Sequence, residues 1–166
     1  MLVETERLIL TELSIDDAPF FFKLVNDPDW IRYIGDRNVS SIHDAENYLN
    51  ERILPSYTKY GFGFYKVSIK ATSKPIGISG LIDREGLDHV DVGFAFLPAG
   101  RGMGYALEST KAVLNYAQNE LNLDPILAIV NTDNKRSHLL LEKLGLQFKK
   151  MIMLPNETKE ICMYST

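Results

Sequence analysis

The sequence predicts a single α/β domain, residues 1–166, with a mixed and mostly antiparallel sheet flanked by helices. Strand-like and helix-like segments follow one another in the order β-α-α-β-β-β-α-β-α-β-β. The apolar spacing changes from strand to helix at Tyr105. Residues 98–125, a stretch of 28, separate the apolar runs at 90–97 and 126–130. Neighbouring strands that run parallel need a long connection of this kind, whereas antiparallel strands can be joined by a short turn. We therefore expect parallel strands at 90–97 and 126–130, joined by the helix from Tyr105.

The first two elements are a strand and a capped helix. Residues 7–13 are rich in β-forming side chains and predict the first strand. The helix that follows has two candidate starts. Ser14 with Asp17 resembles a capping box, whereas Asp16 as the cap would place Pro19 where no helical hydrogen bond is lost. The sequence leaves both starts open.

The next segments combine aromatic residues with a second capping signal. We expect the first helix to end at 26–28 and residues 30–35 to form an aromatic connector. Ser41 with Asp44 predicts the start of a second helix, which Pro55 should disturb.

The remaining elements are mostly strands. Lys74-Pro75 and Pro155-Asn156 predict hairpin turns, and residues 137–144 predict a short helix that Gly145 ends. The run at 126–130 is wholly apolar, as expected of a strand buried on both faces. The strands are expected at residues 64–69, 76–82, 89–97, 126–130, 146–154 and 158–164.

Composition excludes several classes of function. A net charge of −4 and a pI near 5.4 argue against direct nucleic-acid binding. No run approaches the roughly 18 apolar residues of a membrane span, and the acidic N-terminus does not resemble a signal peptide. Cys162 is the single cysteine and the three histidines lack metal-ligand spacing, so we expect neither a disulfide nor a metal site. These features favour the cytoplasm, while the oligomeric state stays open.

Three glycines, at 100, 102 and 104, lie between the predicted strand and helix. The N–H groups at such a helix start have no partners within the helix and lie at the positive end of the helix dipole. They form a site that suits phosphate. A dinucleotide motif would need a third glycine where Leu107 or Tyr105 stands, and a Walker Gly-Lys-Ser/Thr is absent. Glycines alone are also compatible with a simple tight turn.

Three separated stretches resemble one family. Arg101-Gly-Met-Gly104-Tyr-Ala106 fits R/Q-x-x-G-x-G/A, the pyrophosphate loop of the GNAT acetyltransferase superfamily. Residues 134–146 resemble the segment N-x-x-S-x-x-x-L-E-K-x-G-F, and residues 4–10 resemble an entry strand, both typical of the ribosomal-protein N-acetyltransferase branch. Together the stretches span nearly the whole chain in the expected order.

The resemblance implies where acetyl-CoA, the cosubstrate, binds. In such enzymes the strand corresponding to 91–97 bulges and splays from that at 126–130, and acetyl-CoA lies in the opening. Asn134 would hydrogen-bond the cofactor arm; taken alone it would be a turn residue, but within its motif we favour the contact. The remaining contacts implied are main-chain groups of Ala95 and Phe96 at the pantetheine and thioester, amides of Gly102, Met103, Gly104, Tyr105 and Ala106 at the pyrophosphate, and Arg101 beside them.

The reaction implied is direct attack of a free amine on the thioester. A backbone N–H near Phe96 would stabilise the oxyanion. Asp91 stands where the family often has a glutamate base, and strand alternation places it on one face with Gly93 and Ala95. An exposed strand-end carboxylate is an equal interpretation of Asp91. Less favoured bases are Asp83, Glu85 and His89.

The proton donor departs from the family pattern. Enzymes with a tyrosine acid carry it seven residues after the asparagine, where this chain has Leu141. Ser137 is the remaining nearby hydroxyl; it could orient water or hydrogen-bond the sulfur, or be a helix-surface serine. CoA thiol leaves readily, so a dedicated acid is not required. Trp30 and Tyr33 could line an acceptor cleft, but packing is the simpler interpretation.

The sequence therefore predicts an N-acetyltransferase that moves acetyl from acetyl-CoA to a primary amine in a ternary complex. The amine would be a protein N-terminus, including that of a ribosomal protein, or a small amine. A catalytically silent acyl-CoA-binding or regulatory module is the alternative, and a nucleotide-binding protein is a third interpretation that rests on the loop alone.

Overall fold

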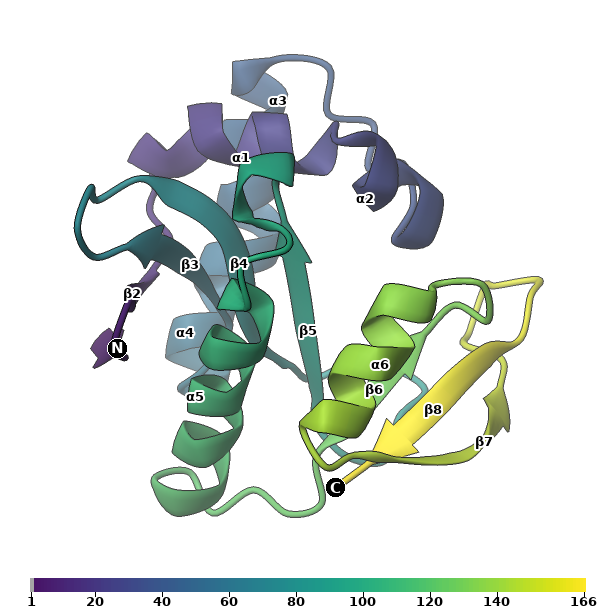
Figure 1. The fold of residues 1–166 in the computed structure, drawn as a ribbon. Coiled ribbons are helices and arrows are strands. Elements are labelled where there is room, and N and C mark those ends of the chain that lie inside the picture. The colour runs from purple at the N-terminus through teal and green to yellow at the C-terminus, as the bar shows by residue number, and fades with distance from the viewer. Residues whose placement is uncertain (1) are drawn as a thin grey trace.

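The structure, a computed structural model, describes residues 2–166 as one mixed sheet with helices on both faces (Figure 1). The strands are β1 (Leu2–Glu4), β2 (Leu8–Glu12), β3 (Phe64–Ile69), β4 (Pro75–Ile82), β5 (Asp91–Phe96), β6 (Leu127–Val130), β7 (Gln147–Ile152) and β8 (Ile161–Ser165). The α-helices are α1 (Ala18–Val25), α2 (Pro28–Tyr33), α3 (Ile42–Tyr48), α4 (Leu54–Tyr60), α5 (Tyr105–Asn119) and α6 (Lys135–Lys143).

The strand order within the described chain is β1-β2-β3-β4-β5-β6-β8-β7. Only β5 and β6 are parallel, and α5 lies in the connection between them, which confirms the predicted crossover. The other neighbours are antiparallel, so the prediction of a mixed and mostly antiparallel sheet is correct. None of the helices described in residues 2–166 has the length and apolar content to cross a bilayer.

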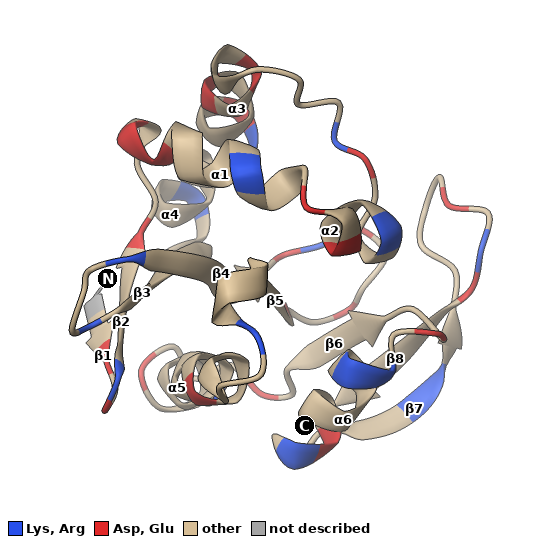
Figure 2. Ribbon diagram, turned by 45° about the horizontal axis from the view of Figure 1, so that its top comes forward, with Lys and Arg blue, Asp and Glu red and all other residues tan. Residues whose placement is uncertain are grey.

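Two apolar clusters hold the sheet between its helices. One contains Val92 and Phe96 of β5 with Val113 of α5. The other lies under α1 to α3 around Phe21, and Ala95 packs against it. Alternate side chains of β5 thus pack on opposite faces of the sheet, because successive side chains of a strand point in opposite directions. Figure 2 shows α5 and the group α1 to α4 on opposite sides of the strands.

The parallel pair is splayed. Asp91 and Leu127 are its single register pair, and the Leu127 N–H donates to the Val90 carbonyl at 2.9 Å. Beyond this point β5 and β6 diverge, with α2 above the opening (Figure 1). The expected bulge in β5 is wrong, however, because β5 keeps one continuous register with β4 over all six residues. The opening arises because the strands turn apart.

Several local predictions need correction. The aromatic connector at 30–35 is largely helix α2, because Asp27 caps it and Pro28 supplies the fixed φ of a first helical position. The last short helix begins at Lys135, not Ser137, because the Asn134 side chain accepts from the Ser137 N–H. Strand β1 was not predicted.

At the first helix the structure confirms the capping box, but α1 itself begins at Ala18, with Asp17 rather than Asp16 in the cap position and Pro19 in its first turn. Ser14 caps a 3₁₀ turn (Ile15–Asp17) that runs into α1, and the Asp17 carboxylate accepts from the Ser14 N–H at 2.9 Å. The disturbance expected at Pro55 is confirmed as a π-helical turn (Leu49–Ile53) immediately before α4.

Candidate active site

The glycine loop leaves a row of backbone donors without partners. Gly102 and Gly104 have φ of 77° and 79°, a region that L side chains rarely adopt. The first hydrogen bond of α5 runs from the Glu108 N–H to the Gly104 carbonyl at 3.0 Å. Within the described chain, the N–H groups of residues 102–106 have no protein acceptor. The start of α5 therefore offers convergent N–H groups suited to an anion.

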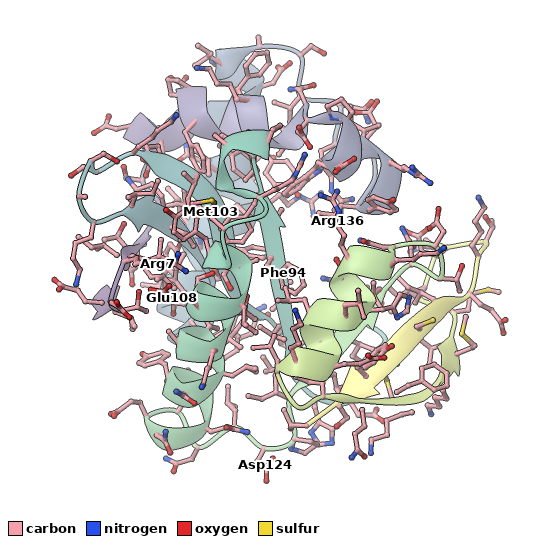
Figure 3. The ribbon with its side chains drawn as sticks, viewed as in Figure 1. Arg7, Phe94, Met103, Glu108, Asp124 and Arg136 are labelled. Atoms are coloured by element: carbon pink, nitrogen blue, oxygen red, sulfur yellow. The ribbon has the colours of Figure 1, made fainter. Side chains whose placement is uncertain are left out.

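The loop is fixed from outside by Arg7, which sequence reasoning did not single out. The Arg7 Nη1 donates to the Met103 carbonyl at 2.9 Å, while its Nε bonds the Glu108 carboxylate at 2.7 Å (Figure 3). The guanidinium also lies 4.6 Å from the centre of the Tyr105 ring. Burial alone would raise the pKa of Glu108, but hydrogen bonds from Thr5 and Arg7 outweigh it and hold the pKa below its usual value.

Arg101 lies in the loop as predicted, but acidic residues engage it. Its Nη2 is 2.5 Å from the Asp27 carboxylate, and its Nη1 is 3.3 Å from that of Asp29. Asp27 is only 8% exposed, so this pair is well shielded from water. A pyrophosphate at the loop would share the charge of Arg101 with two carboxylates.

Helix α2 also contacts the opposite wall of the opening. Asp29 pairs with Arg136 of α6 at 2.5 Å, and Arg32 pairs with Asp133 at 3.2 Å. The Asn131 amide donates to the Tyr33 carbonyl at 2.7 Å. The acidic and basic residues of α2 can be followed in Figure 2. This helix therefore bridges from the glycine loop to the start of α6.

The backbone of β5 presents alternate residues to the opening. The Leu97 N–H donates to the Ile76 carbonyl at 2.9 Å, which sets the alternation of the β4–β5 ladder. By this alternation Ala95 exchanges its main-chain hydrogen bonds with Ile78 of β4. The main-chain groups of Phe94 and Phe96 point the other way, toward the gap between β5 and β6.

Asp91 lies at the point where β5 and β6 part, and it is not an exposed carboxylate. It is 1% exposed, and Arg84 donates to both of its oxygens at 3.2 and 3.3 Å. Burial raises the pKa of Asp91 above its ordinary value, and the Arg84 guanidinium offsets part of this. Of the less favoured bases, Asp83 lines the cleft, whereas Glu85 and His89 are exposed and do not line it.

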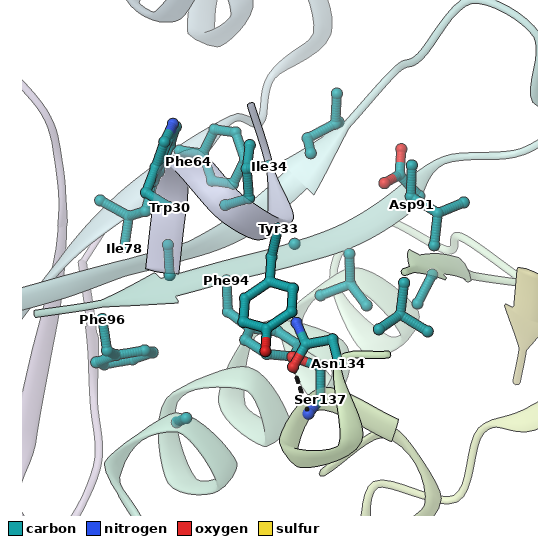
Figure 4. Close-up of a pocket in the computed structure, with 18 of the residues that line it drawn as sticks. Trp30, Tyr33, Ile34, Phe64, Ile78, Asp91, Phe94, Phe96, Asn134 and Ser137 are labelled. Carbon is teal, nitrogen blue, oxygen red and sulfur yellow. Dashed lines mark hydrogen bonds between the residues drawn. The ribbon is translucent and has the colours of Figure 1, made fainter. Parts of the chain in front are cut away.

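Asn134 and Ser137 come together at the start of α6. The Asn134 side chain accepts from the Ser137 N–H at 3.3 Å, and both residues line the cleft (Figure 4). Leu141 is 1% exposed and belongs to the core under α5, so this part of α6 offers no phenol. The indole Nε1 of Trp30 is buried without a partner in the described residues, and Trp30 also lines the cleft.

The cleft formed by these elements has a volume of about 1290 Å³. It extends from the glycine loop past Phe94 and Asn134 to Asp91 and Arg84. This exceeds the 300–1,000 Å³ typical of a single small-molecule site. No group of three or more His, Cys, Asp or Glu side chains in residues 2–166 is arranged to hold a metal ion.

The fold and the cleft define an α/β protein with an anion-binding loop beside a splayed parallel strand pair. Residues 7–147 match the family model described as the acetyltransferase (GNAT) domain. The match covers most of the chain, which therefore belongs to the GNAT family and is an acetyl-CoA-dependent acetyltransferase.

Individual relatives agree with this assignment. The chain is 30% identical over 148 residues to the protein named Uncharacterized N-acetyltransferase YoaA of Bacillus subtilis (strain 168), covering 88% of this chain and 82% of that protein. A structure described as RimL, ribosomal L7/L12 alpha-N-protein acetyltransferase in complex with coenzyme A, has a TM-score of 0.85 at 13% identity, covering 100% and 97%. Spermidine N-acetyltransferase from Vibrio cholerae, in complex with CoA and spermine, has a TM-score of 0.79 at 18% identity, covering 98% and 96%. At these identities the two structures share the fold.

Proposed function

We propose that the chain transfers the acetyl group of acetyl-CoA to a primary amine, by direct attack of the amine in a ternary complex. The observation that carries the proposal is the row of unpartnered N–H groups at residues 102–106, at the mouth of the gap between β5 and β6. Such a row suits a pyrophosphate, and the cleft beside it is also lined by Phe94, Phe96 and Asn134.

The contacts we assign to acetyl-CoA are those that the family resemblance implies, adjusted to the chain's own geometry. The amides of Gly102 to Ala106 hold the pyrophosphate, and Arg101 contributes part of its charge while fixing the loop to Asp27. Phe94 and Phe96 offer their main-chain groups to the pantetheine and thioester, whereas Ala95 contributes only a wall, because its own groups pair with Ile78. Asn134 reaches the cofactor arm from α6.

The chemistry needs an amine without its extra proton and a stabilised oxyanion. The Phe96 N–H, which faces the gap, donates to the oxyanion. Asp91 accepts the amine proton through a chain of waters, because the carboxylate is buried beside Arg84 and lies at the other end of β5, roughly 17 Å along the strand from Phe96. Ser137 hydrogen-bonds the sulfur. The Asp91→Asn variant described below tests the proposed base.

The acceptor is an amine of either a small molecule or a polypeptide N-terminus. Two structural relatives are described as acting on spermidine and on a ribosomal protein. Both descriptions support an amine as the acceptor, and neither kind of amine is preferred. The net charge of −4 favours a cationic acceptor. A cytoplasmic location, expected from the sequence, fits either acceptor.

Thiol release from acetyl-CoA, with mass spectrometry of the acceptors, tests the function. The panel contains spermidine, amino acids and peptides with a free α-amino group, each with a hydroxyl analogue. We expect thiol release and a gain of one acetyl group on at least one amine. Acetyl-CoA binding by calorimetry without turnover on any amine would instead indicate a silent binding module. Stabilisation by ATP or NAD alone would indicate a nucleotide-binding protein.

A further inference from the structure

We propose that Tyr33 donates the proton that the departing CoA thiolate takes up, in place of the phenol that α6 lacks. The inference rests on the proposed function, because it concerns the same thioester. Leu141 occupies the family's tyrosine position and is 1% exposed in the core. Ser137 is the remaining hydroxyl on that face of the cleft, and an alkyl hydroxyl is a much weaker acid than a phenol.

Tyr33 lies at the end of α2, and two contacts fix its position near the start of α6. Its carbonyl accepts from the Asn131 amide at 2.7 Å. The neighbouring Arg32 pairs with Asp133 at 3.2 Å, and its guanidinium lies 4.8 Å from the centre of the Tyr33 ring. Asn131 and Asp133 belong to the turn that leads into Asn134, so the Tyr33 backbone and the cap of α6 are held together.

The Tyr33 side chain faces the cleft. Tyr33 is half-buried and lines the same cavity as Asn134, Ser137 and Phe94. In Figure 4 its ring extends from α2 toward Asn134 and Ser137, with the hydroxyl at that end. Within the described chain the hydroxyl has no hydrogen-bond partner, so its proton is available to a ligand. The cleft is therefore lined by a phenol close to the residues assigned to the thioester end of acetyl-CoA.

The proposed step balances. The amine nitrogen forms the new C–N bond, the C–S bond breaks with its electron pair on sulfur, and the Tyr33 hydroxyl gives sulfur a proton. The nitrogen loses a proton to Asp91 through water, Asp91 releases that proton to solvent, and the phenolate regains one from solvent. Acetyl-CoA and amine thus give amide and free CoA without a net proton change.

The size of the effect follows from the leaving group. General acids typically contribute about 10²–10⁴-fold. A thiolate departs more readily than an alkoxide or an amide. We therefore expect Tyr33→Phe to lower kcat by about tenfold, which is less than general acids typically contribute. The ring is retained, so the Kd for acetyl-CoA and the KM for the amine should stay within about threefold of wild type.

The test measures kcat against pH for wild type, Tyr33→Phe and the control Tyr116→Phe, with acetyl-CoA and the best amine of the panel. Tyr116 lies on α5, outside the cleft, and undergoes the same chemical change. We expect the control Tyr116→Phe to follow the wild-type kcat at every pH, and the Tyr33→Phe kcat to be lower than both throughout.

The outcomes separate this inference from the proposed function. If wild type turns over and Tyr33→Phe keeps kcat within twofold, Tyr33 is not the donor. If Tyr33→Phe changes only the KM for the amine, Tyr33 binds the acceptor and the inference is also wrong. If wild type binds acetyl-CoA but acetylates no amine, the proposed function itself fails, and this inference fails with it.

Discussion

The glycine loop, proposed to bind the cofactor, and the proposed proton-handling groups share one cleft but are built differently. The loop offers backbone N–H groups from five consecutive residues, and two glycines with positive φ set its shape. The proton-handling groups are side chains from separate elements: Asp91 from β5, Tyr33 from α2 and Ser137 from α6. Binding should therefore be sensitive to backbone geometry, and catalysis to single side-chain atoms. The variants below test whether binding and catalysis depend on these different parts of the cleft.

The largest effect is expected for Gly104→Val. A β-carbon at this position would lie 3.3 Å from the Arg7 Nη2 and would have to adopt φ of 79°. Distortion of the loop removes hydrogen bonds to a charged ligand worth about 1.5–3 kcal/mol each, so the Kd for acetyl-CoA should rise by about 100-fold. Calorimetry measures this, and thermal unfolding should show a loss of about 1–3 kcal/mol from strain.

Gly145→Val is the matched control for this strain. Gly145 has φ of 89°, a β-carbon added there would meet no atom within 4 Å, and the residue follows α6 at the far end from Asn134. Its valine variant should lose similar stability while the Kd for acetyl-CoA stays unchanged. An equal rise in Kd for both variants would mean that general destabilisation, not the loop, controls binding.

Asp91→Asn should affect catalysis and leave cofactor binding intact. We expect kcat to fall by about 100-fold, at the lower end of what general bases contribute. Because burial raises the pKa of Asp91, the wild-type kcat should rise with pH above the usual carboxylate range as Asp91 ionises. Over the pH range in which Asp91 is ionised, the kcat of Asp91→Asn should fall furthest below that of wild type at low pH, where the amine is mostly protonated. The difference in kcat should shrink as pH rises.

Asp83→Asn serves as its control, since Asp83 is exposed and lines the same cleft. It should keep kcat within about threefold of wild type. An Asp91→Asn enzyme with unchanged kcat at every pH would remove Asp91 as the base and leave amine positioning as the main source of catalysis.

Glu108→Gln should loosen the loop from outside. The Glu108 carboxylate accepts hydrogen bonds from Thr5 and Arg7, but the Arg7 side chain is 41% exposed. Solvent screening therefore limits the loss of folding stability to about 1 kcal/mol, or roughly 2–4 °C in Tm. The folded-state pKa of Glu108 is lowered, so its stabilising contribution is complete above the unfolded pKa and is lost as pH falls through the folded one. The Tm difference between wild type and variant should therefore be full at neutral pH and vanish in acid. A difference that persists in acid would assign the stabilisation to packing.

Arg136→Met should have the smallest effect. Its side chain is 66% exposed, and exposed ion pairs contribute about 0–1 kcal/mol. Helix α2 keeps its contacts through Arg32 and Asn131, so Tm should change by no more than about 2 °C, and high salt should abolish the difference. A large, salt-independent loss would show that Asp29 needs Arg136 to keep α2 in place.

The sequence predicted the loop better than the groups around it, for a physical reason. The strand, the glycines and the helix of the loop are contiguous, so periodicity and the special conformations of glycine predict them locally. The parallel pairing followed from the change of periodicity and the connection length, whereas its splay was implied by the family resemblance. Arg7 was not found, because its partners Met103 and Glu108 lie about 100 positions along the chain, and a lone arginine in an entry strand carries no local signal.

The acceptor side was predicted less well. Asp27-Pro28 is a helix-start signal, but the aromatic residues after it suggested a connector, so α2 and its ion pairs were missed. The bulge expected in β5 depends on register, which a single strand's sequence does not specify. The partnership of Asp91 with Arg84 likewise follows from how the polar loop before β5 folds back, and no spacing rule predicts it.

The central claim is that the backbone of the glycine loop binds acetyl-CoA. Hydrogen exchange of backbone amides, with and without acetyl-CoA, measures those donors directly. We predict that acetyl-CoA slows exchange at residues 102–106 in wild type and in Asp91→Asn alike, and that Gly104→Val loses this protection. Unchanged exchange at 102–106 under saturating acetyl-CoA, with protection elsewhere in the chain, would contradict the account.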